Sequence, residues 1–300
     1  MGLFLGIDGG GTTTSCVIGD EKSVLGAGTG GPSNVVRVGE AATRTALADA
    51  IGQACSTAGI DPSTIGGACV GIAGAARPQV AATVRKILAE LISCEIEIVG
   101  DATIALQAAF GEGAGVVVIA GTGSVAYGRD ASGRFARAGG WGFMVSDEGS
   151  GYWIGRTAVS AALRDADENP DSNDALLPAI MRAWNLNDRD GLVMAANASP
   201  APDFAGLSPL VAALAGSGND LAREILNRAG TELAAFGEIV VRRLFAHGDG
   251  APVAMSGGVF RHSAVVRETF RSELRRQCPT VAIVEEMSNP VQGALERARK

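Results

Sequence analysis

The feature of the sequence that most constrains the fold is an apolar run followed by a glycine- and threonine-rich turn, and this pattern occurs twice. The first copy is FLGIDGGGTTT at residues 4–14, and the second is VVVIAGTGSVAYG at residues 116–128. Each copy is typical of a strand, a tight turn and a return strand, and each ends in a polar turn, at Gly19-Asp20 and Arg129-Asp130. Two such hairpins predict a chain made of two similar halves.

The composition of these turns indicates phosphate binding. Glycines let backbone N–H groups approach an anion, threonines add hydroxyl donors, and Asp8 at the strand end suits Mg²⁺ or its waters. The dinucleotide-binding pattern G-x-G-x-x-G is excluded, because its last glycine, counted from Gly9, falls on Thr14. The Gly-Lys-Ser/Thr step of a P-loop does not occur in the sequence. A third turn, Gly257-Gly258, also follows an apolar run. An ordinary structural turn is the alternative interpretation at each place.

Composition favours an enzyme of the cell interior. A chain of 300 residues with 47% hydrophobic and 19% charged residues predicts a large core, and its length favours two domains. The net charge of −7 disfavours nucleic acid as a partner. Strand-sized apolar runs and the absence of a leader pattern before the first strand lead us to expect no membrane association and a cytoplasmic location. The five cysteines form no C-x-x-C pair and are expected to be small core residues.

Strands and helices alternate along the first half of the sequence, which predicts an α/β domain with its site at the strand ends. The expected order is a helix at 41–58, a strand at 68–72, a helix at 80–92 and a strand at 95–99 that ends in Gly100-Asp101. In the second half the sequence predicts long helices at 154–164 and 221–245, and His247-Gly248 closes the second of them. It also predicts a proline-rich rigid loop at 198–209 and a last helix that begins at Asn289-Pro290.

Seven short motifs carry a resemblance to a known family. They are DGGGT, GPSN, GD, GTGS, GGWG, SDEGSG and SGG, which lie at residues 8–12, 31–34, 100–101, 121–124, 139–142, 146–151 and 256–258. In these motifs the chain resembles, end to end, the BadF/BadG/BcrA/BcrD-type ATPases, and among them the N-acetylglucosamine and glucosamine kinase branch of the sugar kinase/heat-shock/actin superfamily. The run DEGS followed by GYWIG is the most specific match.

The resemblance implies an α/β fold of the two-domain actin-like ATPase type, a duplicated ribonuclease H-like fold with a cleft between the domains. The expected domains are 1–112, to which a C-terminal helix at 289–300 returns, and 113–288. The resemblance also implies a homodimer whose substrate is a small-molecule amino sugar.

The activity implied by the resemblance is phosphorylation of an amino sugar at its 6-hydroxyl with ATP and Mg²⁺. N-acetylglucosamine is the first candidate substrate and glucosamine the second, and N-acetylmuramic acid stays open. Asp101 matches the catalytic base of these kinases, which accepts the hydroxyl proton. Its alternative interpretation is a helix N-cap, because a helix is expected directly after it.

The resemblance also assigns residues to each ligand. Those expected at ATP are Gly10, Gly11, Thr12, Thr13, Gly121, Thr122, Gly123, Ser124, Gly257 and Gly258, with Asp8 at Mg²⁺ directly or through water. Those expected at the sugar are Asn34, Asp101, Gly140, Trp141, Gly142 and Asp147, because amide and carboxylate groups suit vicinal hydroxyls. Trp141 has a core aromatic as its alternative, and Glu148 is expected to point away from Asp147 if the pair is extended.

Two other functions stay open at this point. One is an ATPase that activates a 2-hydroxyacyl-CoA dehydratase through an iron–sulfur cluster, for which Cys55, Cys69, Cys94 and Cys278 are candidate ligands only if two subunits bring them together. The other is a sugar or nucleotide sensor without enzymatic activity.

Overall fold

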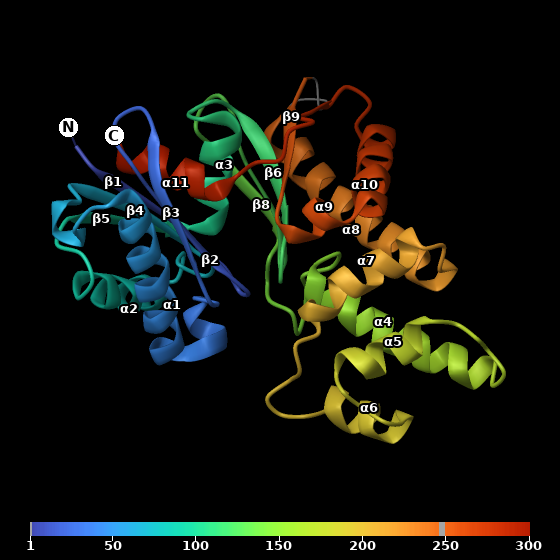
Figure 1. The fold of residues 1–300 in the computed structure, drawn as a ribbon. Coiled ribbons are helices and arrows are strands. Elements are labelled where there is room, and N and C mark those ends of the chain that lie inside the picture. Colours follow the sequence, from blue (N-terminus) through green and yellow to red (C-terminus); the bar gives the residue numbers. More distant parts are fainter. Residues whose placement is uncertain (1, 246–249) are drawn as a thin grey trace. The chain divides into compact units, whose positions relative to one another are not determined.

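The chain forms two compact units, each of which is built from more than one segment. The computed structural model describes residues 2–245 and 250–300. The first unit comprises Met1–Val117, Arg129–Gly133 and Glu285–Lys300, and the second comprises Val118–Gly128 and Arg134–Val284. Two five-stranded sheets with helices around them confirm the predicted α/β class (Figure 1). The predicted domain boundaries stay a prediction. The two units are groups of residues in mutual contact, whereas a domain is defined by its ability to fold independently.

The sheet of the first unit has the strand order β3-β2-β1-β4-β5. Its strands are β1 (Phe4–Gly9), β2 (Thr14–Gly19), β3 (Val24–Gly30), β4 (Gly67–Ile72) and β5 (Glu95–Gly100). β1 pairs antiparallel with β2 and parallel with β4, and β4 pairs parallel with β5. Gly9 lies opposite Ile72, which lies opposite Gly100. The carboxyl ends of these three strands therefore meet at one edge of the sheet.

The second sheet has the order β10-β9-β6-β7-β8 and belongs mainly to the second unit. Its strands are β6 (Gly115–Ala120), β7 (Ser124–Arg129), β8 (Phe135–Gly139), β9 (Pro252–Ser256) and β10 (Ala282–Ile283). Read from β8, this order repeats the first sheet, with β6 in the place of β1 and β7 in the place of β2. The shared order confirms the two similar halves that the paired hairpins predict.

Helices cover both sheets, and most of them belong to the second unit. The first unit has α1 (Val35–Ala58), α2 (Pro78–Ala89), α3 (Asp101–Phe110) and α11 (Pro290–Ala298). The second has α4 (Gly151–Glu168), α5 (Leu176–Ala183), α6 (Arg189–Ala196), α7 (Ser208–Gly216), α8 (Asp220–Leu244), α9 (Gly258–His262) and α10 (Ala264–Gln277). Within the described part of the chain, no helix combines the length and apolar character that a membrane crossing requires.

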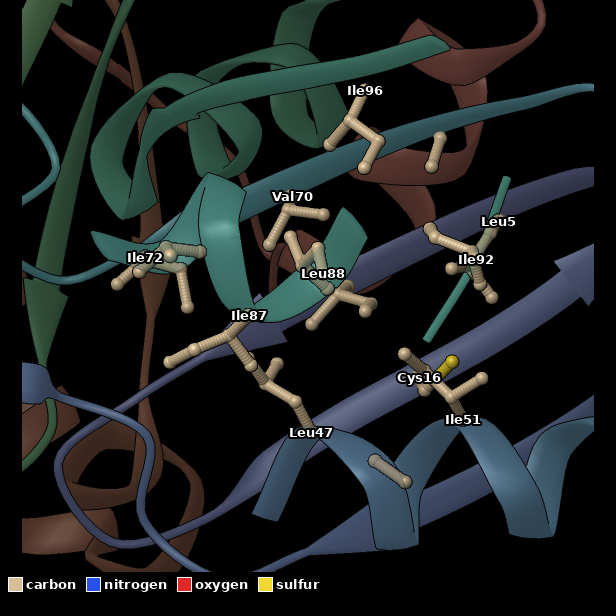
Figure 2. Packing of buried hydrophobic residues seen from close by; sticks show 14 of the residues in the cluster. Leu5, Cys16, Leu47, Ile51, Val70, Ile72, Ile87, Leu88, Ile92 and Ile96 are labelled. Atoms are coloured by element: carbon tan, nitrogen blue, oxygen red, sulfur yellow. The ribbon is translucent and has the colours of Figure 1, made fainter. Parts of the chain in front are cut away.

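Side chains alternate across the first sheet and so form a core on each face. Figure 2 shows one face, where Leu47 and Ile51 of α1 and Ile87 and Leu88 of α2 gather with the strand residues Leu5, Cys16, Val70 and Ile72. The other face is covered by α3 and α11, through clusters that contain Val17 with Leu295 and Cys69 with Ile104. The C-terminal helix thus completes the core of the first unit, and the strand ends that carry Asp8 and Gly100 belong to a sheet packed on both sides.

Several helices differ from the prediction in their bounds, including α1, which begins at Val35, and α2, which ends at Ala89. The loop expected at 198–209 is wrong at its end, because a 3-10 turn at Ala205–Leu207 leads into α7, where Pro209 occupies the first helical turn. Proline is tolerated there because its missing N–H has no intrahelical partner. α4 begins before the expected Ile154, because Ser150 caps it by accepting from the N–H of Trp153. α8 ends at Leu244, and the expected closing residues His247-Gly248 lie outside the described residues.

Glycine permits the close approach of α11 to the rest of the first unit. A Cβ atom at Gly293 would lie 2.6 Å from the backbone nitrogen of Ala108 in α3 and would also meet the carbonyl oxygen of Ile104. A Cβ atom at Gly6 of β1 would lie 2.8 Å from Cα of Leu295. Backbone meets backbone at both positions, so neither neighbour can move aside by a change of rotamer.

We expect Gly293→Ala to destabilise the protein by about 1–3 kcal/mol, the usual penalty for overpacking. Thermal unfolding should show a lower Tm, by about 2–4 °C per kcal/mol. The matched control is Gly52→Ala, which lies exposed within α1 with nothing near the new Cβ. Because alanine loses less backbone entropy in a helix, this control should raise stability by about 0.5–1 kcal/mol. Equal Tm values for the two variants would contradict the packing argument.

Candidate active site

The first glycine turn joins β1 to β2 and is fastened to a distant segment. The N–H of Gly10 closes the turn by donating to the carbonyl of Thr13 at 3.0 Å, and the carbonyl of Gly10 accepts from the N–H of Ser33 at 3.1 Å. The hydroxyl oxygen of Thr14, which is fully buried, lies 2.7 Å from both the carbonyl of Gly31 and the hydroxyl of Ser33. Hydrogen bonds therefore join the turn to residues 31–33, which directly precede Asn34.

Asn34 has a structural role in addition to its predicted sugar contact. Its side-chain oxygen caps α1 by accepting from the N–H of Val36 at 3.2 Å, which leaves the amide NH₂ group outside the cap. The helix breaks after one turn, because Gly39 has φ of 79° and ψ of 171°. Only glycine adopts such angles readily. The first turn of α1 is thus set apart from the long body of the helix.

Asp101 begins α3 directly after β5. Gly100 holds the N-cap position, so the N-cap interpretation of Asp101 is wrong. The Asp101 carboxylate accepts from the N–H of Ala102 at 3.0 Å. Desolvation raises the pKa of the half-buried carboxyl group above the ordinary aspartate value, and the backbone hydrogen bonds from Ala102 and Asp101 act in the opposite direction. A carboxylate with a raised pKa is a suitable proton acceptor at neutral pH.

Asp8 lies at the same edge of the sheet as Asp101. β1 and β5 are two strands apart, so the edge separates their ends by roughly 10 Å, twice the spacing between neighbouring strands. Among the described residues, no group of three or more His, Cys, Asp or Glu side chains is placed to hold a metal ion. The Mg²⁺ ion expected at Asp8 stays a prediction, and an ion of this type needs only one or two carboxylates when phosphates and waters supply its other ligands.

The second glycine turn, between β6 and β7, is fastened in a similar way. The N–H of Gly121 closes the turn by donating to the carbonyl of Gly123 at 2.9 Å. The hydroxyl of Ser124, which is 3% exposed, donates to the carbonyl of Glu148 at 2.7 Å. The N–H of Gly151 donates to the carbonyl of Gly121 at 2.8 Å. The expected phosphate contacts stay a prediction. The N–H groups of Gly10 and Gly121 already donate hydrogen bonds within their own turns.

Asp147 lies against the second turn. Its side chain is 8% exposed, and a Cβ atom at Gly123 would lie 2.8 Å from its Oδ2. The residue has φ of 67°, so the chain is not extended there and the condition on which the expectation for Glu148 depended is not met. Glu148 accepts from the hydroxyl of Ser146 at 3.1 Å. The structure thus brings together two motifs that lie more than twenty residues apart in the sequence.

Trp141 projects from a glycine-rich loop after β8. Its side chain is 68% exposed, so its interpretation as a core aromatic is wrong. The guanidinium group of Arg137 lies 4.0 Å from the centre of its ring. Gly140 and Gly142 both have positive φ, and a Cβ atom at Gly140 would lie 3.0 Å from Val125, the residue after Ser124. The loop with Trp141 therefore lies beside the second turn.

The third glycine turn lies at the end of β6. Gly257, with φ of 97°, links β9 to α9, and a Cβ atom there would lie 2.6 Å from the carbonyl carbon of Ala120. The turn is thus the strand-to-helix connection of the alternative interpretation, packed next to Gly121. A Cβ atom at Gly258 would meet nothing closer than 3.9 Å, which leaves open space beside the backbone. The adenosine contact predicted for this pair is compatible with that space and stays a prediction.

Sequence reasoning missed Thr14, Ser33 and Arg137 as residues that organise the site. Thr14 had a usable signal, because it begins β2 as Ser124 begins the equivalent strand β7. Ser33 lies 19 residues from Thr14 in the sequence, and Arg137 is marked only by its proximity to Trp141.

Comparisons with known proteins agree with the motifs. The sequence profile of the BadF/BadG/BcrA/BcrD ATPase family matches residues 5–298. The chain is 30% identical to an N-acetylmuramic acid/N-acetylglucosamine kinase of Clostridium acetobutylicum, over 100% of this chain and 99% of that protein. It is 29% identical to the glucosamine kinase GspK of Vibrio cholerae, over 79% of each chain.

A solved structure shows the same fold. It is a protein of Chromobacterium violaceum assigned as an N-acetylglucosamine kinase, which superposes with a TM-score of 0.79 at 25% identity and covers 99% of this chain and 98% of its own. Since the family profile spans almost the whole sequence, the chain belongs to the BadF/BadG/BcrA/BcrD ATPase family.

Proposed function

We propose that this protein is an ATP-dependent kinase that phosphorylates an amino sugar at its 6-hydroxyl, with N-acetylglucosamine as the first candidate. The observation that carries the proposal is the Asp101 carboxyl group, whose pKa is raised by burial, at the sheet edge where Asp8 and the first glycine turn also lie. The kinase activities named for the similar proteins support the reaction class.

In this reaction Asp101 accepts the proton of the sugar hydroxyl as the hydroxyl oxygen attacks the γ-phosphorus of ATP. A new bond joins that oxygen to phosphorus while the bond from phosphorus to the departing ADP oxygen breaks. The glycine turns hold the phosphates through the backbone groups that do not close the turns. Mg²⁺, when bound beside Asp8, neutralises charge on the phosphates.

Asn34 and Asp147 are the proposed contacts for the sugar hydroxyls. The Asp147 side chain is 8% exposed, and a hydrogen bond from a sugar hydroxyl to a charged acceptor contributes about 1.5–3 kcal/mol. A site that hydrogen-bonds a substrate hydroxyl discriminates more strongly against a sugar that lacks it than an apolar wall does. Glucosamine is the second candidate, and N-acetylmuramic acid belongs in the same test because the Clostridium relative is named for it.

The iron–sulfur activator is the weaker alternative. A cluster binds thiolates, yet burial raises the pKa of the candidate thiols Cys55, Cys69, Cys94 and Cys278. For Cys69 the pKa rises to about 12. Burial therefore opposes formation of the ligand that the cluster needs.

The deciding experiment is ADP release by the purified protein with MgATP and each of five sugars: N-acetylglucosamine, glucosamine, N-acetylmuramic acid, N-acetylmannosamine and glucose. Stimulation by one amino sugar over the control without sugar supports the kinase and names its substrate. ADP release that ignores every sugar favours the activator, and iron analysis of the protein then follows. Sugar binding without turnover favours a sensor.

A homodimer and a cytoplasmic location stay part of the proposal. Light scattering of the purified protein gives the molar mass in solution, and a monomer would contradict the first. Localisation of the tagged protein in the native host tests the second.

Asp101→Asn should lose on the order of 10²–10⁴ in kcat, the usual contribution of a general base. Its Tm should equal or exceed that of the native protein at neutral pH, because the substitution removes a charge that is partly desolvated. The control is Glu95→Gln, an exposed carboxylate at the other end of β5, which should keep full activity. Turnover by Asp101→Asn near the native value would exclude Asp101 as the base.

The pH dependence should report the same group. Only the ionised Asp101 accepts a proton, so kcat/KM for the sugar should fall toward acid pH with a midpoint above the ordinary aspartate pKa. In the folded state this carboxyl holds its proton more tightly than in the unfolded chain. Its contribution to the free energy of unfolding is therefore highest at acid pH and declines as pH rises through the raised pKa. A midpoint at or below the ordinary value would contradict the assignment.

Asp147→Asn should raise the KM for the sugar about tenfold or more with a smaller effect on the KM for ATP, because a charged acceptor contributes about 1.5–3 kcal/mol. Asparagine also tolerates positive φ, so the substitution tests the charge without adding backbone strain. Asn185→Asp alters the other non-glycine residue at positive φ among those described and should leave both KM values unchanged. Equal changes in the two KM values would indicate a general disturbance of the fold.

A further inference from the structure

Two buried hydroxyl groups occupy equivalent places in the duplicated fold. Thr14 is the first residue of β2 and Ser124 is the first residue of β7, the strands that follow the two glycine turns. β2 and β7 hold the same position in their sheets. The two side chains are 0% and 3% exposed, so water cannot replace the hydrogen bonds that they form.

Each hydroxyl binds a segment that carries a proposed sugar contact. The Thr14 hydroxyl bonds to Gly31 and Ser33, directly before Asn34. A hydroxyl has one proton, so it donates to the Gly31 carbonyl and accepts from Ser33. The Ser124 hydroxyl donates to the carbonyl of Glu148, directly after Asp147. Backbone bonds reinforce the connection, from Ser33 to Gly10 and from Gly151 to Gly121.

We infer that Thr14 and Ser124 are positioning residues that couple nucleotide binding to sugar binding within each unit. The inference rests on the proposed function. When a glycine turn binds phosphate and changes its position, the segment with the proposed sugar contact moves as well, since a buried hydroxyl joins the turn to that segment. Coupling of this kind is reciprocal, so the sugar strengthens nucleotide binding by the same factor as the nucleotide strengthens sugar binding.

The role differs from a plain contribution to stability. A hydroxyl that only stabilises the fold would change Tm and would leave the ratio of sugar affinities with and without nucleotide unchanged. A positioning hydroxyl changes that ratio. The ratio is also insensitive to a uniform loss of sugar affinity, because such a loss affects both measurements equally.

The test is calorimetric titration of N-acetylglucosamine into the protein, alone and with saturating Mg²⁺ and a non-hydrolysable ATP analogue. The native protein should bind the sugar about fivefold or more tightly with the analogue, within the usual range for coupled sites. Thr14→Val and Ser124→Ala should each bring this ratio toward one. Thr14→Ser and Ser124→Thr keep the hydroxyl and should restore it.

Ser288→Ala is the matched control, because Ser288 is also buried and its hydroxyl donates at 2.9 Å to the carbonyl of Ala105, a residue of α3 that belongs to neither turn. This variant should keep the native ratio. If Thr14→Val does not fold, Ser33→Ala removes the partner of the same hydroxyl and takes its place.

The outcomes separate the inference from the proposed function. If the native protein releases ADP with a sugar but its affinity ratio is one, or if the hydroxyl variants keep the native ratio, the coupling is overturned and the kinase stands. If the native protein shows neither sugar binding nor sugar-dependent ADP release, the proposed function falls and the coupling falls with it.

Discussion

The parallel pairing of β1, β4 and β5 is the constraint that brings Asp8 and Asp101 to one edge of the first sheet. Parallel strands end at the same edge, so Asp8 and Asp101 share that edge although 93 residues separate them in the sequence. The pairing itself depends on helices packed on both faces, because a parallel sheet leaves no face for solvent. The C-terminal helix α11 supplies part of that cover, so the end of the chain helps to fix groups near its beginning.

Duplication explains how one hairpin design serves both units. In each unit a glycine turn is closed by its own N–H and fastened by a buried hydroxyl at the start of the return strand. The hydrogen-bond partners differ between the units. In the first unit the Thr14 hydroxyl bonds to Gly31 and Ser33, which precede the helix cap Asn34. In the second unit the Ser124 hydroxyl bonds to the carbonyl of Glu148, which follows Asp147 at positive φ. A shared framework thus presents two different polar groups, an amide at Asn34 and a carboxylate at Asp147.

Much of the fold followed from the sequence because the apolar runs and glycine turns act locally. The strands that lead to Asp8-Gly9 and to Gly100 were predicted from their composition, and so was the α/β class. The cap of α3 was wrong by one residue, since a cap depends on backbone angles that composition does not specify. The exposure of Trp141 and the bond from Thr14 to Ser33 depend on segments that meet only in the folded chain, so no local pattern reveals them.

The break at Gly39 divides α1 into two parts that differ in how much they contribute to the core. The long part holds Leu47 and Ile51 in the core and tolerates little change (Figure 2). The short first turn follows Asn34 and contains the exposed residues Val36 and Arg37, while its first residue, Val35, packs against the core. Val36 and Arg37 can therefore vary between descendants of this protein without repacking of the core, so changes directly beside the Asn34 cap have little effect on folding.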